Sequence, residues 1–177
     1  MHPIAKPLFV GLTAAAMIAA ASPAAPKSKP PAIERRSAAP TAPILQSAAI
    51  KPGAQLLFLS GQLANPLPDS AGKKPAELTM ADYGDTKTQT ISVLEKIKGL
   101  LAAQGYTMGD VFKMTVFVAG DPKLGGKMDF AGMNEGFRQY FLTPDNPVTV
   151  ARSTVQVAAL AGPNFLVEIE VIAAKNP

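Results

Sequence analysis

The sequence predicts an α+β domain in which helices cover one face of a β-sheet. The chain has 177 residues, enough for one domain with its own hydrophobic core. Two segments carry apolar residues at helical spacing, and each lies between β-type runs rich in branched and aromatic residues. Two further β-type runs end the chain. This order of strand, helix, strand, helix, strand, strand is typical of a sheet with its helices on one side.

The N-terminus, residues 1–24, has the layout of a secretory signal peptide. A short basic start, MHPIAK, is followed by the uncharged apolar run PLFVGLTAAAMIAAAS and then by small residues and Pro. The apolar run is shorter than the roughly 20 residues that cross a bilayer. We therefore expect cleavage between Ala21 and Ala25, a periplasmic or secreted protein, and no stable membrane association. An uncleaved anchor is the alternative.

Residues 25–42 are rich in Pro, Ala, Ser and basic residues and lack an apolar period, which predicts a disordered linker. The folded domain is expected over residues 43–177. The charge of the chain supports this division. Residues 1–40 hold five of the 17 Lys and Arg residues and one of the 13 Asp and Glu residues. Residues 41–177 therefore carry no net charge, and we expect no nucleic-acid partner.

The residue types that are missing exclude several chemistries. The chain has no Cys, and its one His is His2, inside the predicted leader. Catalytic triads with His, Cys nucleophiles and His/Cys zinc sites are therefore excluded from the mature protein. No nucleotide-binding glycine motif is present either.

The first predicted elements are a strand over residues 54–62, after the turn sequence KPG, and a helix from about Met80. A short strand at 44–50 could precede them. Thr79 or Asp82 is expected to cap the helix, and Gly105 to end it. Its apolar stripe is formed by Ile91, Val93, Leu94, Ile97, Leu100 and Leu101.

A strand over residues 110–120 follows, and then a second helix within MDFAGMNEGFRQYF, with Asp129 as its cap. The spacing of Phe130, Met133, Phe137 and Phe141 predicts one core-facing side of this helix.

The last two β-type runs, VARSTVQVAAL and FLVEIEVIAA, are separated by AGPN, which predicts a hairpin turn. Alternation then gathers five polar side chains on one face of the hairpin: Arg152, Thr154, Gln156, Glu168 and Glu170. Either this face is solvated and carries cross-strand ion pairs, or another subunit covers it. A covered arginine needs an acidic partner or an anionic ligand.

These segments closely resemble the RidA (YjgF-type) family of reactive-intermediate deaminases. The similarity lies in ARSTVQVAAL followed by VEIEVIA, in LLFLSGQ, and in MTVFVAG with MDFAGMNEGFRQYF, in that order along the chain. The resemblance implies a chorismate-mutase-like mixed sheet with two helices on one face. It also implies homotrimers with pockets at subunit interfaces, and hydrolysis of 2-imino and enamine acids to 2-keto acids and ammonium, for which neither a metal nor a cofactor is needed.

Carried over by motif, the resemblance implies that Arg152 grips the substrate carboxylate and that Glu168 positions or activates the attacking water. It also implies substrate-binding or supporting roles for Ser60, Gly61, Asn134 and Thr154. Plainer roles stay open. Arg152 could form an interface ion pair, Glu168 could pair with Arg152 or a neighbouring chain, and Ser60 and Asn134 could be structural hydrogen bonders.

The sequence departs from the family pattern at three positions. Ile44 stands where many members have Tyr, Thr154 follows ARS where Cys is frequent, and Ala161 replaces the usual Pro. These departures bear on substrate preference more than on fold. The alternative function is a non-catalytic trimer that binds small carboxylates or acts as a holdase.

Overall fold

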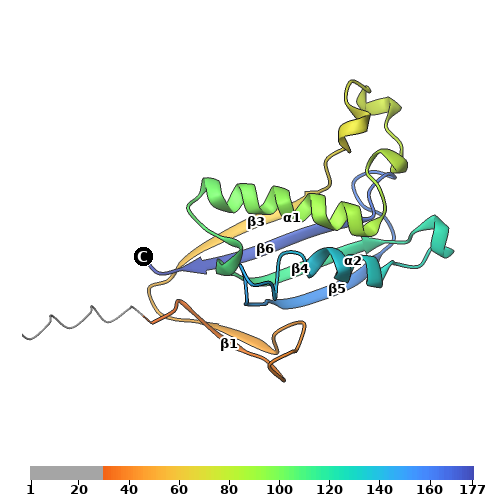
Figure 1. Ribbon diagram of the computed structural model, residues 1–177. Coiled ribbons are helices and arrows are strands. Elements are labelled where there is room, and N and C mark those ends of the chain that lie inside the picture. Colours follow the sequence, from red (N-terminus) through yellow and green to blue (C-terminus); the bar gives the residue numbers. More distant parts are fainter. Residues whose placement is uncertain (1–29) are drawn as a thin grey trace, which may run out of the picture.

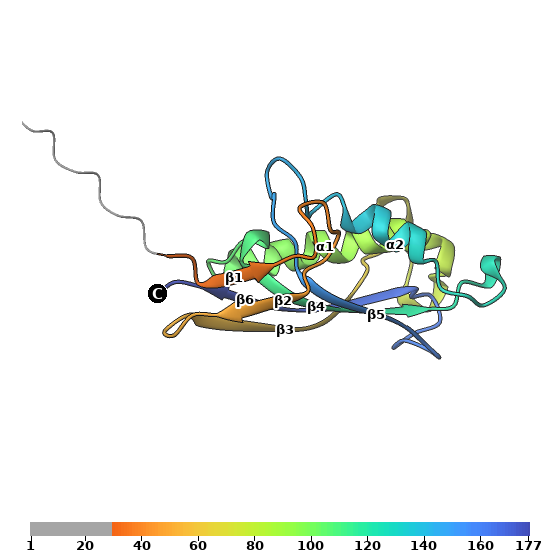
Figure 2. The ribbon, with the colours of Figure 1, turned by 90° about the horizontal axis from the view of Figure 1, so that it is seen from below.

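The computed structural model describes residues 30–177, in which a four-stranded sheet is covered on one face by two helices (Figures 1 and 2). The strand order is β3–β6–β4–β5. The strands are β3 (Gln55–Leu63), β4 (Val111–Ala119), β5 (Ala151–Val157) and β6 (Val167–Lys175). The helices are α1 (Thr86–Ala103) and α2 (Phe130–Phe137). The predicted α+β fold is confirmed.

The connections explain why both helices lie on the same face. β5 runs parallel to β4, and α2 joins them. β3 and β4 are both antiparallel to β6, and α1 makes the crossover between them. Parallel strands need such crossovers, and since crossovers are right-handed, successive ones in the same direction place their helices on one face.

The predicted hairpin of the last two strands is wrong. β6 does not pair with β5. It lies between β3 and β4, so β4 separates the two strands that are consecutive in sequence. The connection over residues 158–166 passes the end of β4 instead of making a tight turn. Local turn residues could not reveal this, because they do not specify which strand a segment pairs with.

The first helix begins later than the sequence suggests. Thr79 precedes a single 3₁₀ turn, Met80–Asp82, and Asp82 ends it. The cap of α1 is instead Asp85, which accepts a hydrogen bond from the Thr88 amide at 2.8 Å. The predicted stop is confirmed, because Gly105 has the left-handed conformation with φ of 71°. Much of the predicted stripe is fully buried, namely Val93, Leu94, Ile97 and Leu101.

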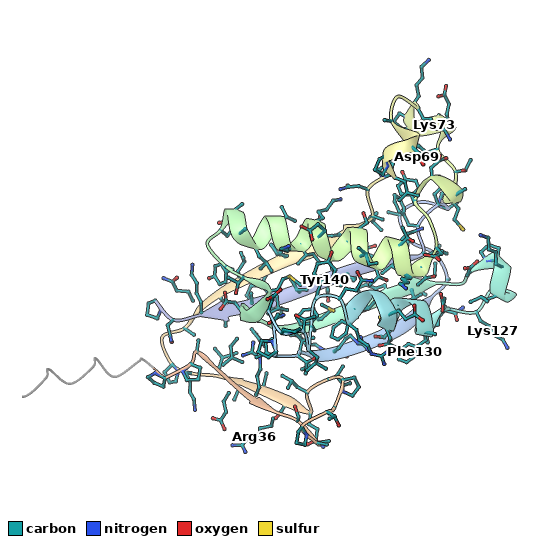
Figure 3. The ribbon with its side chains drawn as sticks, viewed as in Figure 1. Arg36, Asp69, Lys73, Lys127, Phe130 and Tyr140 are labelled. Carbon is teal, nitrogen blue, oxygen red and sulfur yellow. The ribbon has the colours of Figure 1, made fainter. Side chains whose placement is uncertain are left out.

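The second helix is capped as predicted, but it ends at Phe137, so Phe141 lies beyond it. Asp129 accepts a hydrogen bond from the Gly132 amide at 2.8 Å and caps α2. Met133, Phe137 and Phe141 are buried, and the rings of Phe137 and Phe141 stack. Phe130, expected in the core, is 47% exposed at the start of α2 (Figure 3).

The folded part begins before residue 43. β1 (Ile33–Arg36) pairs with β2 (Ser47–Ile50), and Ile33 is buried against Ala174 of β6. The Arg35 guanidinium fastens β1 to the main sheet by donating to the carbonyls of Gly109 and Val111. The expectation of a disordered linker over 25–42 is therefore wrong for β1. The predicted signal peptide lies outside the described residues, and over residues 30–177 no helix is long and apolar enough to span a bilayer.

Candidate active site

Arg152 lies on the edge strand β5, with its side chain directed to the face of the sheet that carries α2. Its guanidinium stacks on the ring of Phe137, 4.4 Å from the ring centre. One terminal nitrogen donates to Asn134 Oδ1 at 2.7 Å, and the other lies 3.7 Å from the sulfur of Met133. Three residues of α2 therefore hold one end of the guanidinium and leave other N–H donors available.

Asn134 supports Arg152 in a fixed orientation. Its Nδ2 donates to the Phe130 carbonyl at 2.8 Å, which turns Oδ1 toward the guanidinium. The sequence suggested a substrate-binding or supporting role for this residue. Its hydrogen bonds correspond to the supporting role.

Arg152 is a half-buried cation that forms no ion pair with any Asp or Glu between residues 30 and 177. Burial, and next the nearby charge of Arg138, lower the pKa of Arg152 to about 10. A buried charge without a counter-ion is costly, because it has lost water and gained no partner. A carboxylate ligand would supply that partner in bidentate geometry.

Thr154 follows two residues later on the same face of β5. Its register partner is Val116, a core residue of the helix-covered face, as Met114 is for Arg152. The Thr154 hydroxyl is buried and has no hydrogen-bond partner within the described part of the chain. Buried hydroxyls are normally paired, so this unpaired oxygen is an exception within residues 30–177. We call Arg152, Asn134 and Thr154 the arginine site.

Ser60 and Gly61 form a β-bulge. Between Leu59 and Gln62 the strand β3 advances three residues while its partner β6 advances two, from Val171 to Ile169. The bulge brings the backbone of Gly61 against the side chain of Glu168. A β-carbon at Gly61 would lie 2.8 Å from the carboxyl carbon of Glu168 and would overlap its Oε1. We call Ser60, Gly61 and Glu168 the glutamate site.

The two sites lie on opposite faces of the sheet, which corrects the prediction that all five polar side chains share one face. Glu168 is in register with Phe117, whereas Arg152 is in register with Met114. These two β4 residues are three positions apart, and side chains alternate along a strand, so they point to opposite sides. Glu170 lies on the open face with Glu168 and is exposed.

The glutamate site borders a hollow on the open face. This hollow has a volume of about 290 Å³ and is lined by Glu168 together with Phe117, Val157, Ala159, Leu160 and Ala161. The sequence analysis did not select Phe117. Its place between two buried valines in MTVFVAG could have indicated it, because alternation along the strand puts Phe117 on the other face of the sheet. Between residues 30 and 177, no three His, Cys, Asp or Glu side chains gather closely enough to hold a metal ion.

The open face of the sheet is apolar for a surface. Phe58 is 68% exposed, and Leu56 and Val155 are also exposed. Register places them on this face, since Phe58 pairs with Ile172 and Leu56 with Ala174, and neither helix covers it (Figure 2). We call Leu56, Phe58 and Val155 the open-face patch. Exposed apolar clusters of this kind mark association surfaces.

Ile44 lies beside the start of β5. The Leu45 amide donates to the Val150 carbonyl at 3.0 Å, and the Thr149 hydroxyl donates to the Pro43 carbonyl at 2.8 Å. These two bonds hold Ile44 next to the strand that carries Arg152. The residue is partly exposed and offers an apolar side chain there.

Comparison with known proteins matches nearly all of the folded part. The profile of the family described as endoribonuclease L-PSP matches residues 36–175. A RutC family protein of Pyrococcus horikoshii is 40% identical over 130 residues, which are 73% of this chain and 86% of that protein. The 2-iminobutanoate/2-iminopropanoate deaminase of Escherichia coli is 32% identical over 121 residues, 68% of this chain and 80% of that protein.

A solved structure supports the same grouping. The crystal structure of E. coli TdcF with bound serine superimposes with a TM-score of 0.50 at 33% identity. The match covers 72% of this chain and 85% of that chain.

Proposed function

Since the chain belongs to the endoribonuclease L-PSP family of YjgF/RidA proteins, we propose that it hydrolyses 2-imino acids and their enamine tautomers. The products are 2-keto acids and ammonium. The observation that carries the proposal is the half-buried guanidinium of Arg152, which has no carboxylate partner among residues 30–177. It is oriented by Asn134, and two residues further on the same face of β5 Thr154 has a buried hydroxyl without a hydrogen-bond partner among residues 30–177.

In the proposed reaction, Arg152 binds the carboxylate of the substrate and thereby fixes the position of the adjacent C2 atom. A protonated imine is already electrophilic at C2. Water adds there while Glu168 accepts a proton from it, which gives a tetrahedral carbinolamine. Glu168 then returns the proton to the nitrogen, and cleavage of the C–N bond releases ammonia while the C2 hydroxyl loses its proton and becomes the keto group. Ammonia takes up that proton and becomes ammonium in solution.

The proposal requires two copies of the chain. The arginine site and the glutamate site lie on opposite faces of one sheet, so one substrate cannot touch both within a single copy. Because β5 is an edge strand, a neighbouring copy whose open-face patch is buried beside that edge would bring its glutamate site next to the arginine site. We propose a homotrimer, which closes with one complete site at each of three interfaces.

Ammonium release from freshly generated imines tests the function. An amino-acid oxidase produces 2-iminopropanoate or 2-iminobutanoate in the cuvette, and the decay of the imine is followed with and without the purified protein. Acceleration that is lost in Arg152→Gln supports the proposal. A decay rate equal to that in buffer with the wild-type protein refutes it.

A second candidate is binding of small carboxylates without turnover. The observation that favours it is Ile44, which brings no hydroxyl to the strand that carries Arg152. Binding of a 2-keto acid that depends on Arg152, with no imine hydrolysis, would select this candidate. Suppression of client aggregation that persists in Arg152→Gln would instead indicate a holdase.

We also propose that the protein acts outside the cytoplasm, because residues 1–24 have the layout of a cleavable signal peptide. Expression of the full chain followed by N-terminal sequencing of the exported form is the test. A new N-terminus between Ala21 and Ala25 supports export, and an intact Met1 on cytoplasmic protein contradicts it.

A further inference from the structure

Arg138 extends the face of α2 that contacts Arg152. That face is formed by Met133, Asn134 and Phe137, all of which touch the guanidinium. Residues three or four positions apart lie on the same side of a helix. Arg138 is four positions after Asn134, and as the C-cap residue that follows the helix it keeps helical dihedral angles, φ −65° and ψ −12°. Its Cα therefore continues this face by one turn.

The acidic groups of α2 are already engaged elsewhere. Glu135 forms an ion pair with Lys87 of α1 at 2.9 Å, and Lys87 and then, to a smaller extent, the charge of Arg138 lower the pKa of its carboxyl group. Asp129 caps the helix. Neither Arg138 nor Arg152 forms an ion pair in the part of the chain that the structure describes.

Two arginines near one another repel, and the second cause of the lowered pKa of Arg152 is the charge of Arg138. A ligand with one carboxylate neutralises Arg152 and leaves the exposed Arg138 without a carboxylate in direct contact among residues 30–177. A ligand with two carboxylates neutralises both. Guanidinium groups suit this task because each binds a carboxylate through two parallel hydrogen bonds.

We propose that Arg138 is a specificity-determining residue that binds a second, distal carboxylate, so that the preferred substrates are dicarboxylic 2-imino acids. The inference rests on the carboxylate-binding role proposed for Arg152. It assigns the substrate class: imines derived from acidic amino acids, in preference to imines with short apolar side chains.

Binding of 2-keto acids tests the inference without requiring turnover. The affinities of 2-oxoglutarate and 2-oxobutanoate are measured by calorimetry for the wild type, Arg138→Gln and Arg138→Lys. Wild-type protein is expected to bind 2-oxoglutarate about two- to fivefold more tightly, the range of one exposed ion pair. Arg138→Gln should remove this preference and change 2-oxobutanoate affinity less than about twofold. Arg138→Lys, which keeps the charge, should retain part of it.

Lys74→Gln, in the segment between β3 and α1, is the matched control, because it removes an exposed cation from another element and should leave the preference intact. Equal wild-type affinities for the two keto acids would overturn the inference, as would equal losses for both in Arg138→Gln. The imine assay separates the two proposals. Discrimination in binding without hydrolysis keeps the Arg138 subsite and removes the deaminase, whereas hydrolysis without discrimination does the reverse.

Discussion

The carboxylate of Glu168 on β6 lies directly over Gly61 on β3, in the space that a β-carbon at position 61 would occupy. The bulge at Ser60 and Gly61 produces this contact, since the extra residue brings the backbone toward β6. A glycine at this position therefore determines where the proposed water-activating group stands. The sequence SGQ has a structural explanation that does not require Ser60 to bind the substrate.

Gly61→Ala is expected to displace Glu168 and leave the fold intact. Because a displacement of about 1 Å in a catalytic group can lower the rate about 100-fold, we expect kcat/KM for imine hydrolysis to fall by about that factor. Gly99→Ala is the matched control. Gly99 lies in α1 with open space around it, and the change should raise stability by about 0.5–1 kcal/mol without affecting activity. Full activity in Gly61→Ala would show that Glu168 needs no fixed position.

Arg152→Lys is expected to lower kcat/KM about 100-fold, because an ammonium cannot replace the bidentate contact or the stacking on Phe137. Asn134→Ala should lower it about tenfold, because the guanidinium loses the hydrogen bond that orients it. Steady-state kinetics check both values. A larger loss in Asn134→Ala than in Arg152→Lys would contradict the supporting role of Asn134.

Arg152→Gln and Glu168→Gln are expected to complement one another. Each variant alone should be inactive, because each removes one half of every site. Co-refolding the two should restore part of the activity, because some interfaces then join an intact arginine site to an intact glutamate site. Mixing without unfolding is the control and should restore nothing if subunits do not exchange. No recovery after co-refolding, with mixed oligomers verified by native mass spectrometry, would mean that both groups act from the same copy.

Phe58→Glu is expected to prevent association. The substitution places a charge in the open-face patch, where burial against another copy would leave it without water or a partner. Light scattering should report trimers for the wild type and monomers for the variant. Circular dichroism should show an unchanged fold, because Phe58 makes little contact within its own chain. Leu124→Glu, at another exposed apolar residue, is the control and should remain associated.

Asp82→Asn is expected to loosen the segment over residues 64–85, which connects β3 to α1 and carries Asp69 and Lys73 (Figure 3). The Asp82 carboxylate accepts hydrogen bonds from Lys73, Ser70 and both the amide and hydroxyl of Thr79. These bonds, first that of Lys73, hold the pKa of Asp82 well below its ordinary value of 3.8. The carboxylate therefore stabilises the segment above about pH 4, and the stabilisation is lost as the pH falls further.

Limited proteolysis of this segment measures the effect. The wild type should become more susceptible with acidification below pH 4, assayed with an acid-stable protease. Asp82→Asn should be susceptible at neutral pH. Asp69→Asn is the control, since Asp69 is an exposed neighbour outside this hydrogen-bond network. Equal protection of Asp82→Asn and wild type would contradict the role assigned to the network.

The elements that the sequence predicted well are those set by local rules. Asp129 caps α2 and Gly105 ends α1, because capping and left-handed turns depend on a few adjacent residues. The similarity to RidA proteins, carried by several motifs in order, is confirmed by the family match over residues 36–175. The start of the fold was missed, because β1 is short and gains its stability from β2 and β6 rather than from its own pattern.

The sequence by itself determined the type of the main elements and the family, and it supplied the candidate residues whose positions the structure then gave. Periodicity and motif chemistry reside in neighbouring residues, so they can be read without coordinates. Only the tertiary structure decided that β6 inserts between β3 and β4, and that Arg152 and Glu168 consequently point to opposite faces. Strand pairing brings together residues far apart in the chain, and the choice of partner depends on the free energy of the whole sheet rather than on any segment within it.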